Sequence, residues 1–159
     1  MAVTKYCDNL ITQFDTITND RKKLLENISH YISSKQEANQ PIQLVYICTH
    51  NSRRSHFGQI WAQVAANYYH IENVTAFSGG TEATAFNINA INAIKRVGFD
   101  VKAIDEKSNT TFHVSYNEIK KPIVCFSKVY DDISNPQSEF AAIMTCRDRK
   151  STRLNSSHQ

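Results

Sequence analysis

The sequence contains no apolar run that approaches the roughly 20 residues a helix needs to span a bilayer. Residues 1–10 also lack the basic and then apolar pattern of a signal peptide. From these two absences we predict a cytoplasmic chain with no membrane partner.

Closely spaced cysteine pairs are missing as well. The four cysteines (Cys7, Cys48, Cys125 and Cys146) show no spacing such as C-x2-C. This pattern argues against a zinc site and against a dense disulfide framework. We therefore expect reduced thiols and no metal site.

Most of the chain also lacks an excess of either charge. The formal net charge is +3, but residues 148–159 hold three basic residues and one acidic one, a net of +2. The rest therefore carries about +1, which leaves no basic face and predicts no nucleic-acid partner. Residues 148–159 have no apolar periodicity and are predicted to be a non-native tail, the alternative being a genuine disordered tail.

What the sequence does contain is the composition of one globular domain. Its 159 residues are 41% hydrophobic and 21% charged, enough to bury a core. In residues 1–40 apolar residues recur at helical spacing on both sides of Thr18, which predicts an N-terminal extension of two helices with a structural role. Residues 41–147 are predicted to form the main domain, because strand and helix patterns alternate there.

The main domain is predicted to be α/β, with a doubly wound, Rossmann-like parallel sheet in a three-layer arrangement. The predicted strands are residues 42–47, 74–78, 123–127 and 141–145, with a short edge segment at residues 101–104. The predicted helices are residues 53–69 and 87–97, the second closed by Gly98. Gly79 and Gly80 are predicted to form a turn that needs permissive backbone angles.

The polar segment that follows Cys48 carries two arginines and leads into a predicted helix. A turn of this kind can point successive backbone N–H groups at one centre, and the helix adds the positive end of its dipole, so an oxyanion fits there. The same field lowers the pKa of a thiol, which makes the thiolate available near neutral pH. Arg54 offers a planar fork for two oxygens of a tetrahedral anion. Cys48 is therefore interpreted as a nucleophile rather than as a small buried hydrophobe.

Residues 48–55, Cys-Thr-His-Asn-Ser-Arg-Arg-Ser, resemble the C-x5-R-S signature of the low-molecular-weight protein tyrosine phosphatases and of the thioredoxin-coupled arsenate reductases that share their fold. Residues 77–82, Phe-Ser-Gly-Gly-Thr-Glu, resemble the second segment of that family, Ser-Ala-Gly-Thr-Glu. The resemblance covers residues 43–146. It implies the family's fold and a chemistry that needs neither a metal nor an organic cofactor.

The resemblance also implies roles for single residues. Cys48 is the implied nucleophile, Arg54 binds the oxyanion, and the Ser55 hydroxyl donates to the thiolate. Thr81 and Glu82 resemble residues that brace the loop. The loop residues implied to surround the oxyanion are Thr49, His50, Asn51, Ser52, Arg53 and Arg54.

Three positions in this loop have further interpretations. Asn51 is expected to hold the turn, since asparagine tolerates left-handed angles and bonds its own backbone. His50 stands where relatives often have glycine, so its backbone must suit a residue with a side chain. Arg53 either points outward or helps to attract anions. His56 has no partner that the sequence identifies, and a surface or core histidine is the default interpretation.

Three functions are compatible with these residues. The first is a phosphatase that forms a cysteinyl-phosphate from a phosphoester. The second is an arsenate reductase, in which Cys146 resembles the first redox cysteine and thioredoxin or another thiol supplies electrons. The third is an anion-binding fragment without turnover.

The sequence identifies no general acid for the first of these functions. The family takes it from an aspartate in an Asp-Pro loop late in the chain, whereas Asp131 and Asp132 precede the last predicted strand. The second redox cysteine and the family's closing helix are missing too. The resemblance is therefore to a family member without its C-terminal part.

Overall fold

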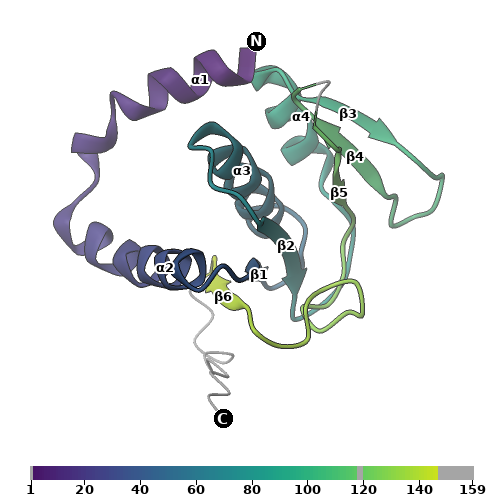
Figure 1. Cartoon of the computed structure of the whole chain (residues 1–159). Coiled ribbons are helices and arrows are strands. Elements are labelled where there is room, and N and C mark those ends of the chain that lie inside the picture. The colour runs from purple at the N-terminus through teal and green to yellow at the C-terminus, as the bar shows by residue number, and fades with distance from the viewer. Residues whose placement is uncertain (1, 118–119, 147–159) are drawn as a thin grey trace.

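The computed structural model describes residues 2–117 and 120–146 and shows an α/β fold with N-terminal helices (Figure 1). Its helical elements are α1 (Ala2–Ile11), the short 3-10 helix η1 (Phe14–Thr16), α2 (Asn19–Glu37), α3 (Arg54–Tyr68) and α4 (Ile88–Val97). Its strands are β1 (Ile42–Cys48), β2 (Val74–Gly80), β3 (Asp100–Ala103), β4 (Phe112–Ser115), β5 (Ile123–Cys125) and β6 (Ala141–Met144).

The central element is β1, which pairs in parallel with β2 on one side and with β6 on the other. In this register Cys48 lies beside Gly80, and Ile47 lies beside Met144. Because the carboxyl ends of parallel strands meet at one edge, the segments after β1, β2 and β6 all begin there. The prediction of parallel strands at residues 42–47, 74–78 and 141–145 is confirmed.

The sequence-based prediction for the strand at residues 123–127 was wrong in its pairing. It was expected to be parallel, but β5 pairs antiparallel with β4, which in turn pairs antiparallel with the edge strand β3. The physical reason is visible in its burial: Ile123 and Cys125 are covered, whereas Val124 between them is 44% exposed. A strand covered on one face suits a small antiparallel sheet.

After β5, one isolated bridge is all that pairs in parallel with the main sheet between β5 and β6 in the described residues. Val129 pairs in parallel with Gly80, and the Gly80 N–H donates to the Lys128 carbonyl over 2.9 Å. Residues 128–130 therefore run beside the end of β2 although they form no regular strand. This places them at the same edge as Cys48.

The predicted turn at the two glycines that end β2 was also wrong. Gly79 and Gly80 belong to the strand, and neither has a positive φ, whereas Gly98 does, with φ 115° at the predicted end of α4. Glycine is needed at Gly79 for space instead, since a Cβ there would lie 2.4 Å from Tyr130 Cα.

The helix α3 packs close to its predicted position and buries Ile60 and Val64 completely. Trp61 and Tyr68 are partly buried against the same core, as expected. Ala65 was expected in that stripe but is exposed. It faces an apolar groove that α1 borders without filling.

The two N-terminal helices differ in how deeply they pack. In α1, Val3 and Cys7 are buried in the core cluster that includes Ile91 and Ile94 of α4. In α2, which begins at the predicted cap Thr18, no residue is buried. It is held beside β1 and the segment before β6 by the Tyr31 hydroxyl, which donates to the Gln43 and Glu139 carbonyls over 3.2 and 3.1 Å. None of the helices described is long and apolar enough to cross a membrane.

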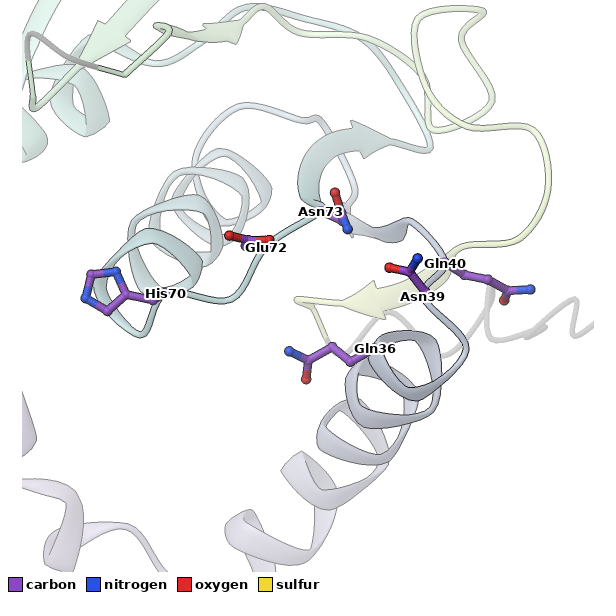
Figure 2. Close-up of a pocket in the computed structure, with 6 residues that line it drawn as sticks. All are labelled: Gln36, Asn39, Gln40, His70, Glu72 and Asn73. Carbon is purple, nitrogen blue, oxygen red and sulfur yellow. The ribbon is translucent and has the colours of Figure 1, made fainter.

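A polar pocket lies at the amino ends of β1 and β2, opposite the edge that carries Cys48 (Figure 2). It is lined by Gln36, Asn39, Gln40, His70, Glu72 and Asn73. Asn39 and His70 have positive φ because each follows the end of a helix, and the next N–H bonds back to that helix, as in Gln40 to the Lys35 carbonyl. The pocket is thus a product of two helix ends.

Candidate functional site

The candidate site is the loop between β1 and α3, called the thiol loop below and defined as residues 48–55. Cys48 is the last residue of β1, and Arg54 is the first residue of α3. The sequence folds this way because an apolar strand ends at Cys48, and the polar residues after it leave the sheet before the helix begins. The predicted strand, loop and helix are all present.

Three buried side chains form the inner part of the thiol loop. Cys48 Sγ lies 3.0 Å from Ser55 Oγ, and Asn51 Nδ2 donates to the same oxygen over 2.8 Å. Cys48 is only 3% exposed, and Ser55 and Asn51 are fully buried. Ser55 Oγ accepts a hydrogen bond from Asn51, and its hydroxyl can donate a hydrogen bond to the sulfur when the sulfur is ionised. The resemblance implied that the Ser55 hydroxyl donates to the thiolate, and the 3.0 Å contact allows either atom to be the donor.

The pKa of the Cys48 thiol is lowered by this environment. Burial is the largest influence and raises the pKa, because it disfavours the charged form. The Ser55 hydroxyl and the backbone N–H groups of Ser55, Ser52 and Asn51 act in the opposite direction, and together they outweigh the burial. The net effect is a lowered pKa, and the hydrogen-bond donors around the sulfur favour the thiolate, which is the nucleophilic form of cysteine.

Asn51 fixes the shape of the loop through its backbone and its side chain. Its φ is 43°, in the left-handed region that asparagine was expected to tolerate, and His50 beside it has no positive φ. The side-chain oxygen accepts from the Lys128 N–H over 2.8 Å rather than from its own backbone. Asn51 therefore joins the thiol loop to a segment 77 residues away.

The end of β2 braces the thiol loop from the neighbouring strand, as expected for Thr81 and Glu82. The Thr81 N–H donates to the Cys48 carbonyl over 3.1 Å, and the Thr81 hydroxyl and the Glu82 N–H both donate to the Thr49 carbonyl. A Cβ on Gly80 would lie 2.6 Å from Asn51 N and 2.7 Å from the Thr49 carbonyl oxygen. Glycine is required there because the loop passes so close.

Several residues of the site were missed by sequence reasoning. The His50 carbonyl accepts from the hydroxyls of Thr84 and Ser127, over 3.0 and 3.1 Å. Asn109 in turn exchanges two hydrogen bonds with the Ser127 backbone, over 2.7 and 3.1 Å. These residues have no motif of their own. The only signal was that Ser127 ends a predicted strand.

Asn87 provides one more link to the loop. It caps the start of α4, and its N–H donates to the Ser52 carbonyl over 2.9 Å. Contacts from the segment after β2, the cap residue of α4 and the segment after β5 thus hold the carbonyls of Thr49, His50 and Ser52. Carbonyls held outward leave the loop N–H groups free to point to the centre.

His56 lies beneath the thiol loop as a neutral core residue. It is fully buried against the Phe86 ring, and its Nδ1 lies 3.3 Å from Ser78 Oγ. Burial, with a smaller contribution from the nearby Lys128 charge, lowers its pKa to about 3. This agrees with the default core interpretation and excludes His56 as a proton donor near neutral pH.

Both arginines of the loop are exposed at the start of α3. Within residues 2–117 and 120–146, no ion pair involves Arg53 or Arg54. A cation at a helix N-terminus is opposed by the helix dipole, so an anion bound at the loop would supply the missing partner.

Cys146 lies next to the loop although it is 98 residues from Cys48. Thr145, just before it, donates from its N–H and its hydroxyl to the Ile47 carbonyl over 2.8 and 2.9 Å. As a result Cys146 Sγ lies 3.7 Å from Thr49 Oγ1, and Thr49 follows Cys48 directly. All four cysteines are free thiols.

Of the two adjacent aspartates before β6, Asp132 has a structural role. The Asp132 carboxylate accepts from the N–H and the hydroxyl of Ser134, over 2.9 and 2.7 Å, and these bonds lower its pKa. Asp131 is exposed. In the part of the chain that the structure describes, no group of three or more His, Cys, Asp or Glu side chains is arranged to hold a metal ion. The predicted tail at residues 148–159 lies outside that part.

Comparison with known proteins finds no matching family model, no matching curated protein and no matching solved structure.

Proposed function

We propose that this chain is a cysteine-dependent phosphatase of the low-molecular-weight protein tyrosine phosphatase type. The observation that carries the proposal is the 3.0 Å contact between Cys48 Sγ and Ser55 Oγ, together with the lowered pKa of the Cys48 thiol. A thiolate at the carboxyl end of a parallel strand and at the start of a helix is placed to attack a bound oxyanion. The fold proposed with it is the doubly wound, three-layer sheet of that family.

In the proposed reaction Cys48 attacks the phosphorus of a phosphoester in line with the bond that breaks. The loop amides and the Arg54 guanidinium stabilise the charge on the three remaining oxygens. The P–O ester bond breaks, the departing oxygen takes a proton from solvent to give the alcohol, and a cysteinyl-phosphate remains. Water then attacks this intermediate, and Ser55 stabilises the thiolate as it departs. The proposed reaction uses no metal or organic cofactor, and the reduced thiol that it needs fits a cytoplasmic location.

A second candidate, thioredoxin-coupled arsenate reduction, is favoured by one specific observation. Cys146 Sγ lies 3.7 Å from the hydroxyl of Thr49, the neighbour of Cys48. In this reaction Cys48 binds arsenate, and Cys146 attacks the sulfur of the adduct. Two thiols are oxidised to a disulfide, arsenate is reduced to arsenite, and thioredoxin or another dithiol restores the thiols.

A single pair of assays separates these activities. Hydrolysis of para-nitrophenyl phosphate supports the phosphatase, and arsenate turnover that depends on thioredoxin supports the reductase. C48S is expected to abolish either activity, and C146S should abolish only the second. Silence in both assays, with phosphate still protecting Cys48 from iodoacetamide, would identify an anion-binding protein without turnover.

A further inference from the structure

The loop between β3 and β4, residues 104–111, is shaped by its own hydrogen bonds. The Asp105 carboxylate accepts from the N–H groups of Lys107 and Thr111, over 3.3 and 3.2 Å. Asn109 lies between these two anchored positions in the chain. The loop therefore presents the Asn109 side chain from a backbone that is already held in place.

Asn109 joins this loop to the segment after β5. Its side-chain oxygen accepts from the Ser127 N–H over 3.1 Å, and its amide nitrogen donates to the Ser127 carbonyl over 2.7 Å. A side chain that bonds both backbone groups of one residue fixes the position and the orientation of that residue. Ser127 and the next residue, Lys128, are both buried, so water competes little with these bonds.

The position of this segment is passed to the Cys48 sulfur by an unbroken series of hydrogen bonds. The Lys128 N–H donates to Asn51 Oδ1 over 2.8 Å. Asn51 Nδ2 donates to Ser55 Oγ, also over 2.8 Å, and Ser55 Oγ lies 3.0 Å from Cys48 Sγ. A shift of the segment after β5 therefore moves the Asn51 amide, and with it the hydroxyl beside the sulfur.

We propose that Asn109 is a positioning residue of the thiol loop, which keeps the Asn51 side chain in place through the segment after β5. The Ser55 hydroxyl is thereby held beside the Cys48 sulfur. This inference rests on the proposed role of Cys48 as an ionised nucleophile, and it holds whether Cys48 attacks a phosphoester or arsenate. Asn109 acts on the geometry of the hydrogen-bond donors around the sulfur and takes no part in the chemical steps.

The test measures the pH dependence of Cys48 alkylation by iodoacetamide, with the alkylated peptide identified by mass spectrometry. N109A removes both bonds to Ser127 and should move the alkylation midpoint to higher pH, because the donors that favour the thiolate become less well aligned. The shift should be smaller than that of S55A, which removes a donor outright. Inorganic phosphate should also protect Cys48 in N109A only at a higher concentration than in the wild type.

Two control variants separate positioning from a general loosening of the fold. T110A removes a hydrogen bond to the Lys107 carbonyl inside the same loop, and V3A leaves a cavity in the core at α1. Both should keep the wild-type midpoint. In an N51G background, N109A should produce a smaller further shift than in the wild type, because the bond from the Lys128 N–H is already lost.

The outcomes that contradict the inference are distinct. A wild-type midpoint with wild-type phosphate protection in N109A, or an equal shift in T110A or V3A, would overturn the positioning role of Asn109 alone. An undiminished shift in the N51G background would overturn the route through Asn51. A wild-type Cys48 that reacts like free cysteine, without protection by phosphate, would overturn the proposed function and this inference with it.

Discussion

At the scale of single residues, the pKa of the Cys48 thiol is lowered by its nearest hydrogen-bond donors. Burial raises the pKa of this thiol, and the groups that reverse the effect are the Ser55 hydroxyl and three N–H groups of the loop. Short-range donors of this kind depend on loop geometry within tenths of an ångström. The pKa of the Cys48 thiol therefore responds to small changes in the geometry of the thiol loop.

The first prediction concerns the hydroxyl that contacts the sulfur. S55A should raise the pKa of Cys48, because it removes a hydroxyl whose hydrogen bond to the sulfur favours the charged form. The pH dependence of iodoacetamide alkylation measures this shift. S34A, which removes an exposed hydroxyl on α2, is the control. An unchanged midpoint in S55A would contradict the proposed role.

The second prediction separates the two contributions of Asn51. N51G keeps a residue that tolerates φ 43° but removes the hydrogen bonds to Ser55 and from Lys128, whereas N51A also strains the backbone. N51G should lose about 2 kcal/mol in unfolding free energy, and N51A about 1 kcal/mol more. Urea denaturation measures both. Equal losses would mean that the backbone angle costs nothing.

At the scale of elements, β2 holds the thiol loop in place by close approach. G80A would put a Cβ 2.6 Å from Asn51 N, so the loop must move away from the strand. The variant should lose about 1 to 3 kcal/mol of stability through overpacking. Phosphate should also no longer protect its Cys48 from alkylation by iodoacetamide.

A matched variant shows whether that loss is specific. G58A creates a clash of the same kind with the Tyr46 ring, on the face of α3 that packs against β1. It should cost similar stability while the Cys48 alkylation profile stays near that of wild type. If both variants change the thiol equally, the loop responds to general loosening and not to β2.

The two N-terminal helices are expected to differ in their contribution to stability. Val3 of α1 is 1% exposed in the main core, whereas Leu24 of α2 is 61% exposed. V3A should lose about 2 kcal/mol, since it leaves a cavity, and L24A should stay within about 0.5 kcal/mol of wild type. Denaturant unfolding measures both, and a large loss in L24A would show that α2 is buried in solution.

At the scale of the whole molecule, the unfolding free energy should decrease as the pH falls below about 6.5, before the carboxylates begin to titrate. His56 has a folded pKa of about 3, below its ordinary value of 6.5, so the unfolded chain binds its proton first. The stabilisation by neutral His56 is full above pH 6.5 and is lost as the pH falls toward 3, at no more than about 1.4 kcal/mol per pH unit.

Unfolding free energies between pH 7 and pH 4.5 test this expectation. H56Q should flatten the slope over this range, while H30Q should leave it unchanged because His30 is exposed. The lowered pKa values of Asp105 and Asp132 act at more acidic pH and should not mask the effect. If the unfolding free energy of the wild type does not change with pH in this window, His56 is protonated in the folded state as readily as in the unfolded state.

Much of the parallel sheet could be predicted from the chain, because local patterns specify it. The apolar run before Cys48, the helix that begins at Arg54 and the cap at Gly98 are each encoded within a few residues. The thiol loop was predicted for the same reason. Asn51 was expected to hold the turn because asparagine tolerates left-handed angles, and its φ of 43° lies in that region.

The remainder depended on contacts between distant segments. Nothing local to Ser127 or Asn109 says that one bonds the His50 carbonyl and the other bonds Ser127. The glycines of β2 were misread as a turn because glycine serves both positive φ and close approach, and only the packed neighbours distinguish them. The antiparallel β5 was missed because a run of three strand residues carries too little periodicity to show its partner.

The sequence by itself determined that Cys48 lies between a strand and a helix, since a strand, a polar turn and a helix start are local consequences of residue order. Only the tertiary structure decided what surrounds that thiol. The carbonyls of the loop are held by the segment after β2, the cap residue of α4 and the segment after β5. Cys146 lies beside the loop because β6 pairs with β1. The physical reason is that hydrogen bonds and steric contacts act over a few ångströms in space, regardless of how many residues separate the partners in the chain.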